Sequence, residues 1–122
     1  MEIFKSFTFD AAHQLAANVC EGHKYAGIHG HSFEVELRLT GTPGADTGWV
    51  RDFAEIDAAI APVRAMLDHA YLNQIAGLER PTLENLAAWI WQKAKPALPE
   101  LSEIRVIRGS NREGCVYRGP AA

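Results

Sequence analysis

The most regular pattern in the chain is segment 31–41, HSFEVELRLTG, in which apolar and polar side chains alternate without a break. Phe33, Val35, Leu37 and Leu39 fall on one side of this pattern. A period of two predicts a strand with one buried and one polar face. Such a strand is typical of an antiparallel sheet that is covered on one side only. The following GTPGADTG segment predicts the turn that ends it.

Three other segments have strand character. They are EIFKSFTFD (2–10), EIRVIRG (103–109) and GCVYRG (114–119). The last two are separated by the turn residues SNRE, which predicts a hairpin. Residues 11–30 show no sustained period, and we interpret them as a long functional loop.

Two segments have helical periodicity. The first predicted helix covers 53–67, with Asp52 as its N-cap and a kink or weak turn at Pro62. The second opens at Thr82 and runs until Pro96 disturbs it. The order of elements predicts one α+β domain over residues 1–122, with two helices on one face of an antiparallel sheet. The edges of such a sheet favour assembly with further copies.

Charge and composition narrow the class of partner. The formal net charge is −3, and the lysines and arginines are scattered, which argues against nucleic acid. No apolar run approaches the ~20 residues of a membrane helix, and the first residues lack the apolar stretch of a secretion signal. We therefore expect a cytoplasmic protein without membrane contact, in which Cys20 and Cys115 are free thiols.

Three histidines are candidate metal ligands. His29 and His31 are two residues apart, so both imidazoles point to one face of a strand. His13 follows the first predicted strand, where an antiparallel neighbour can bring it alongside. Three neutral imidazoles with an open fourth position are typical of a catalytic zinc site. The alternative is that the HxH pair is ordinary surface polarity.

Another histidine, His69, directly follows Asp68. A carboxylate beside an imidazole can fix its tautomer and make it a proton shuttle. The alternative is a histidine at a helix C-terminus next to an ordinary exposed aspartate. His23 lies alone in the EGHK loop, and we expect it to be exposed to solvent.

Six separated motifs are similar to one family. They are FTFDAAHQL, HGHSF, GWVRDFAEI, LDHAYLN, PTLENLAAWIW and CVYRG, in this order over nearly the whole chain. In order and spacing they resemble the 6-pyruvoyl-tetrahydropterin synthase family, and within it the bacterial 6-carboxy-5,6,7,8-tetrahydropterin synthase branch of queuosine biosynthesis.

The resemblance implies a tunnelling fold (T-fold), with a four-stranded antiparallel sheet and two helices per subunit. Such subunits assemble into a barrel, as a dimer of trimers or as a tetramer. It also implies Zn²⁺ on His13, His29 and His31, and a substrate such as 7,8-dihydroneopterin triphosphate. An Asp–His pair matching Asp68 and His69 would relay protons. A cysteine would act as base, and a glutamate would bind the pterin.

Two positions depart from the family pattern. Tyr25 stands where the base cysteine is expected, four residues before His29. A phenol, with a pKa near ~10, ionises less readily than a thiol. Tyr25 therefore either acts as an acid–base group with a lowered pKa or only closes the mouth of the pocket. Cys20, five residues upstream, is a further candidate for the missing thiol.

Arg108 stands where the pterin-binding glutamate is expected. A guanidinium only donates hydrogen bonds, so it suits a carboxylate, a phosphate or a carbonyl-rich edge. Arg108 and Glu113 flank the predicted turn and can form a cross-strand ion pair. Alternatively, Glu113 reaches the pterin from the facing strand.

Two functions follow from these observations. One is a zinc-dependent, lyase-like enzyme acting on a pterin or a related metabolite, with its standard activity weakened by Tyr25 and Arg108. The other is a non-catalytic or re-purposed zinc protein that binds a different small ligand. The Asp68–His69 pair favours the enzyme, because a scaffold needs no proton relay. The two replacements favour the alternative.

Overall fold

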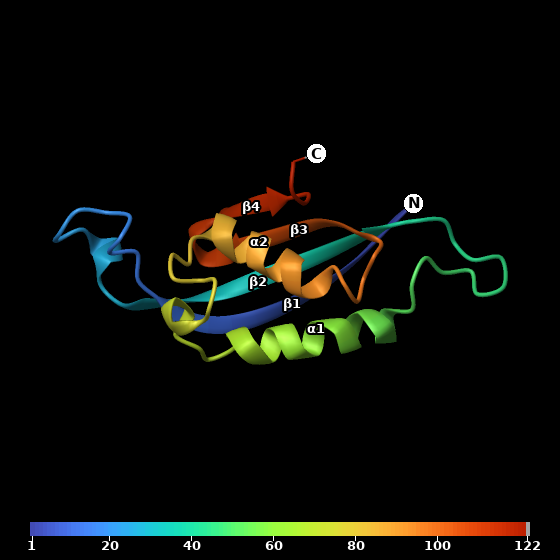
Figure 1. Ribbon diagram of the computed structural model, residues 1–122, viewed down its shortest axis with the longest axis horizontal. Coiled ribbons are helices and arrows are strands. Elements are labelled where there is room, and N and C mark those ends of the chain that lie inside the picture. Colours follow the sequence, from blue (N-terminus) through green and yellow to red (C-terminus); the bar gives the residue numbers. More distant parts are fainter. Residues whose placement is uncertain (122) are drawn as a thin grey trace.

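A computed structural model describes residues 1–121 and shows a four-stranded antiparallel sheet with the strand order β1-β2-β3-β4 (Figure 1). The strands are β1 (Glu2–His13), β2 (His29–Thr40), β3 (Leu101–Arg108) and β4 (Glu113–Tyr117). The predicted strands and the predicted hairpin are therefore confirmed. The hairpin turn is a short 3-10 helix, η3 (Gly109–Asn111), followed by Arg112 in the left-handed region at φ 55°.

Both helices lie on the same face of the sheet (Figure 1). They are α1 (Phe53–Leu67) and α2 (Leu83–Ala94). The predicted N-caps are confirmed, because the Asp52 carboxylate accepts the N–H of Ala54 at 2.9 Å and the Thr82 hydroxyl accepts that of Asn85 at 3.2 Å. α1 is one continuous helix over the predicted range, with Pro62 inside it.

The core lies between the helices and the apolar face of the sheet. Val35, Leu37 and Leu39 of β2 are fully buried, as the alternation predicts. They share one hydrophobic cluster with Ile56 of α1 and Leu86 of α2. Burial of this cluster removes apolar surface from water, which is the main force that holds the helices on the sheet.

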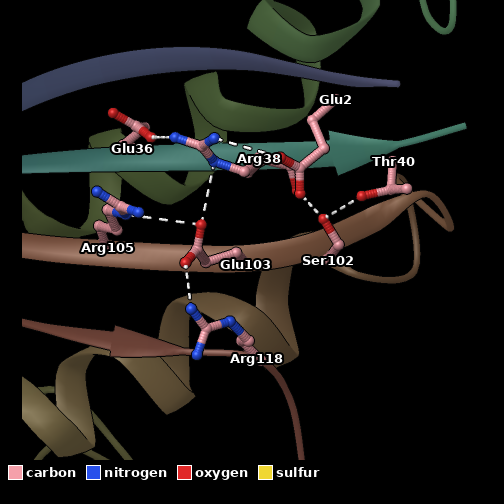
Figure 2. Close-up of polar contacts among 8 residues, drawn as sticks. All are labelled: Glu2, Glu36, Arg38, Thr40, Ser102, Glu103, Arg105 and Arg118. Atoms are coloured by element: carbon pink, nitrogen blue, oxygen red, sulfur yellow. Dashed lines mark hydrogen bonds and ion pairs between the residues drawn. The ribbon is translucent and has the colours of Figure 1, made fainter.

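The other face of the sheet carries charged side chains joined in ion pairs (Figure 2). Arg38 contacts Glu36 at 2.6 Å and Glu103 at 3.0 Å. Glu103 is only 5% exposed and also pairs with Arg105 and Arg118. The carboxylate of Glu103 is therefore compensated by three guanidinium groups, which is the condition for burying a charge.

The first two strands, β1 and β2, extend beyond their predicted ends. β1 continues to His13 and β2 starts at His29, and these two residues form the last pair of the ladder. The segment after α1 runs along the outer edge of β1. Its contacts are His69 N–H to the Asp10 carbonyl at 2.6 Å and Ala12 N–H to the Ala70 carbonyl at 3.0 Å. Residues 11–13 and 29–30 are therefore strand, not loop, because tertiary pairing supplies their hydrogen bonds.

Neither α-helix in the described part of the chain is long and apolar enough to cross a membrane.

Candidate metal centre

The three predicted histidines meet at one end of the sheet. The β1–β2 register pairs His13 with His29 and Ala11 with His31. Each histidine offers one ligand atom, and these atoms all lie within 4.8 Å of one another. His13 is fully buried, and the other two are half-buried. The grouping predicted from the HxH spacing and the first strand is therefore present in the fold.

Backbone carbonyls fix the tautomers of two of these rings. The Nδ1 atom of His13 lies 3.0 Å from the Pro81 carbonyl, and that of His29 lies 2.8 Å from the Gly27 carbonyl. A carbonyl can only accept, so both Nδ1 atoms carry the proton. In the neutral rings, both Nε2 atoms then present lone pairs to each other at 3.0 Å.

Two facing lone pairs at this distance repel unless a proton or another cation lies between them. The Nε2 atom of His31 is buried and has no hydrogen-bond partner among residues 1–121. The donor set is therefore three imidazole nitrogens, two of them oriented by second hydrogen bonds, as metal-binding histidines usually are. These residues fit a zinc ion with three protein ligands.

The electrostatics keep two of these rings neutral. Burial lowers the pKa of His13 from 6.5 to about 4, with smaller contributions from His29, His31 and Arg108. Burial also lowers the pKa of His31, followed by the charge of Arg108. The neutral imidazole is the form that binds a metal, so the lowered pKa values of His13 and His31 favour metal binding.

Asp68 and His69 form the predicted pair, with 3.0 Å between the Asp68 Oδ2 and His69 Nδ1 atoms. The N–H of Asp10, and next the imidazole of His69, lower the pKa of the Asp68 carboxyl. His69 adopts a left-handed backbone (φ 59°), and its side chain is 79% exposed. Among residues 1–121, neither member of the pair hydrogen-bonds to the three histidines.

His69 and His31 both contribute to the lining of a pocket of about 460 Å³. The pocket also includes Asp10 and Ser32, and the Ser32 hydroxyl donates to the Asp10 carboxylate at 2.6 Å. Asp10 and Ser32 were not predicted from the sequence, because an isolated aspartate and serine have no distinctive spacing.

Arg108 and Glu113 form the predicted ion pair across the hairpin, at 2.7 Å. The side chain of Arg108 is 15% exposed, and its buried Nε atom has no hydrogen-bond partner in the described part of the chain. Because its charge contributes to the lowered pKa values of His13 and His31, Arg108 lies in the electrostatic environment of the cluster. Asn111 donates to the same Glu113 oxygen at 3.2 Å.

Tyr25 lies in a short 3-10 helix, η1 (Lys24–Ala26), at the rim of the cluster. Its ring centroid is 6.1 Å from that of His29 and 4.9 Å from that of His23, and the residue is 37% exposed. His23 is exposed, as expected, and its Nδ1 atom accepts the N–H of Tyr25 at 3.1 Å. Cys20 is an exposed free thiol on the same loop.

The chain is similar in sequence to known proteins. The sequence profile of the family described as 6-pyruvoyl tetrahydropterin synthase matches residues 2–120. The chain is 43% identical over 111 residues to 6-carboxy-5,6,7,8-tetrahydropterin synthase of Synechocystis, covering 86% of this chain and 84% of that protein. It is 33% identical over 107 residues to dihydroneopterin monophosphate aldolase of Pyrococcus furiosus, covering 88% and 84%.

A solved structure has the same fold as this chain. The structure of 6-pyruvoyl tetrahydropterin synthase of Caenorhabditis elegans superposes with a TM-score of 0.88 at 21% identity, covering 98% of this chain and 96% of that one. The chain belongs to the 6-pyruvoyl tetrahydropterin synthase family.

Proposed function

We propose that this member of the 6-pyruvoyl tetrahydropterin synthase family is a zinc-dependent lyase acting in the cytoplasm on a pterin of the 7,8-dihydroneopterin triphosphate type. The observation that carries the proposal is the cluster of His13, His29 and His31, with two Nε2 atoms 3.0 Å apart. The Synechocystis relative, a 6-carboxy-5,6,7,8-tetrahydropterin synthase by name, supports the reaction class. From the resemblance of the sequence motifs we also propose a role in queuosine biosynthesis.

The three histidines would hold the zinc ion. Bound there, zinc supplies Lewis-acid chemistry, polarising a substrate oxygen without redox change. The hydrogen bonds to Pro81 and Gly27 keep the rings of His13 and His29 oriented while substrate binds. The apolar packing around His13 excludes water from one side of the site.

His69 would accept and return the substrate proton at its free Nε2 atom. Its Nδ1 atom faces the Asp68 carboxylate at 3.0 Å, which holds the tautomer and stabilises the imidazolium that forms. Asp68 is itself oriented by the N–H of Asp10 at 3.1 Å. Tyr25, at the rim of the cluster, would either serve as the second acid–base group or close the pocket.

Arg108 and Glu113 would bind the heterocycle of the substrate. Because Arg108 engages Glu113 Oε1, the second carboxylate oxygen of Glu113 is left to accept hydrogen bonds from the donor-rich edge of a pterin. Arg108 offers its remaining donors to carbonyl or acidic groups. This arrangement differs from a single anchoring carboxylate, so we expect the standard conversion to be weak.

The same arrangement favours a second candidate. A half-buried guanidinium whose charge acts on His13 and His31 suits an anionic ligand better than a pterin. The alternative function is therefore a re-purposed zinc protein that binds a different small ligand through Arg108.

We also propose that the chain assembles into a barrel-like homo-oligomer, a dimer of trimers or a tetramer. β1 and β4 are the two edge strands of the sheet. An uncovered edge presents unpaired N–H and C=O groups, which a second copy can satisfy.

The test is conversion of 7,8-dihydroneopterin triphosphate, followed by chromatography, with zinc-loaded protein and with protein stripped by a chelator. We expect slow conversion that requires the metal. Equally small amounts of product with zinc-loaded and with stripped protein would show that the chain is not a zinc-dependent lyase. If the zinc-loaded protein then binds a small anionic ligand and the stripped protein does not, the second candidate is supported.

A further inference from the structure

Asn73 hydrogen-bonds to the backbone of the residue that directly follows His13, the buried candidate metal ligand. Its side-chain oxygen accepts the N–H of Gln14 at 2.9 Å, and its side-chain nitrogen donates to the carbonyl of Gln14 at 3.0 Å. One amide therefore satisfies both backbone groups of one residue, across a separation of 59 positions in the sequence. Neither group then needs water at this half-buried position.

These two hydrogen bonds take the place of pairing with β2, because Gln14 lies just beyond the last residue pair of the sheet. β1 ends at His13, and the His13–His29 pair is the last of the β1–β2 ladder. Terminal pairs of a ladder open most easily, because only one side supports them. Asn73 adds a support beyond the last pair, next to the residue whose imidazole must be held.

The same side chain reaches the segment that orients the His13 ring. The Asn73 Nδ2 atom lies 3.5 Å from the Glu79 carbonyl, a long and weak contact. Two residues later, the carbonyl of Pro81 accepts the His13 Nδ1 proton at 3.0 Å. Asn73 thus contacts both the backbone that carries His13 and the loop that fixes its ring.

We infer that Asn73 is a positioning residue of the metal centre, which sets the orientation of His13 by clamping Gln14 to the loop before α2. The inference rests on the proposed three-histidine metal site. Residues that orient a metal ligand commonly change metal affinity 10–100-fold when they are replaced. We expect an effect of about that size from Asn73.

The experiment compares Asn73→Asp and Asn73→Ala with the native protein. Asn73→Asp keeps the shape and the acceptor for Gln14 N–H, but sets a second acceptor against the Gln14 carbonyl. The control is Asp52→Ala, which removes a hydrogen bond of 2.9 Å at the N-terminus of α1, at the opposite end of the molecule (Figure 1). Loss of such a cap lowers the stability of the folded protein, so it reports a general destabilisation.

Two quantities are measured: the Kd for Co²⁺ in chelator competition, and the visible absorption of the Co²⁺-loaded protein, which reports coordination geometry. We expect both Asn73 variants to bind Co²⁺ about 10–100-fold more weakly, with an altered spectrum, and Asp52→Ala to match the native protein. Native-like affinity and spectrum in Asn73→Asp would overturn the inference.

Thermal unfolding of each variant separates positioning from folding. If both Asn73 variants are unfolded where Asp52→Ala is folded, Asn73 is a general structural residue and the inference is wrong. If the native protein itself fails to bind Co²⁺, the proposed metal site fails, and the inference fails with it.

Discussion

The Nε2 atoms of His13 and His29 lie 3.0 Å apart, while the Nδ1 atom of each ring donates to a backbone carbonyl. This relationship follows from the strand register, which makes the two residues the last pair of β1 and β2. Because the carbonyls accept the Nδ1 protons, the two facing Nε2 atoms carry lone pairs. The backbone hydrogen bonds therefore orient both rings so that their Nε2 atoms can bind one cation between them.

The metal-free protein should lose stability as the pH falls from about 6.5 to about 4. Burial lowers the pKa of His13 to about 4 in the folded chain, whereas an unfolded histidine titrates near 6.5. The unfolded state takes up the proton first, so acid favours unfolding by about 1.4 kcal/mol per pH unit for each such proton. His31, whose pKa is also lowered, acts in the same direction.

Urea unfolding at several pH values measures this effect. His13→Gln should show a shallower dependence than the native protein, and the control His23→Gln, which alters an exposed histidine, should retain the native slope. An unfolding free energy of the native protein that is flat between these pH values would contradict the prediction.

Restoring the residues expected in the family should raise the rate at which 7,8-dihydroneopterin triphosphate is converted. The native protein should convert 7,8-dihydroneopterin triphosphate poorly, because removal of a positioned base costs on the order of 10²–10⁴-fold. A mismatched hydrogen-bonding partner at position 108 adds a binding penalty. Tyr25→Cys combined with Arg108→Glu should therefore turn over well above either single variant.

The two changes act on one bound substrate, so their effects need not add. Product formation by the native protein, both single variants and the double variant gives the comparison. A native protein as fast as the double variant would show that Tyr25 or Cys20 already serves as the base.

Assembly should depend on the N-terminal half of the β1 edge. Nearer the site, the outward groups of β1 are occupied: the Thr8 carbonyl by Arg64 at 2.8 Å, and Asp10 and Ala12 by the segment after α1. By the alternation of an antiparallel strand, the N–H of Ser6 also points outward. We expect Ser6→Pro to weaken assembly by removing this donor, while β1 stays paired with β2.

Light scattering at micromolar concentration, with Ser6→Ala as the matched control, measures the effect. We expect the native protein and Ser6→Ala to form the same oligomer, and Ser6→Pro to be smaller. A monomeric native protein would contradict the assembly.

Local sequence patterns were sufficient for the helices and the middle of the sheet. Asp52 and Thr82 act as the N-caps they resemble, and the alternation from Phe33 to Leu39 is that of a strand. The ends of β1 and β2 were not predictable, because residues 11–13 have no alternating pattern and are strand only through pairing with β2 and with the segment after α1.

Some residues of the candidate site were also predictable from the sequence, and others were not. The three histidines and the Asp68–His69 pair follow from spacing, and the Arg108–Glu113 pair follows from the position of the turn. The carbonyls of Pro81 and Gly27 could not be found, because a backbone acceptor has no sequence signature. The partners of Asn73 were equally hidden, because its contact with Gln14 depends on the tertiary fold.

The zinc content of protein purified without added metal decides whether the three histidines form a metal site. We predict about one equivalent of zinc per chain in the native protein, bound by His13, His29 and His31, and loss of that zinc in His31→Ala. His23→Ala, which replaces an exposed histidine outside the cluster, should keep the native content. Well under one equivalent in the native protein, or equal zinc in the native protein and His31→Ala, would show that these histidines are not a zinc site.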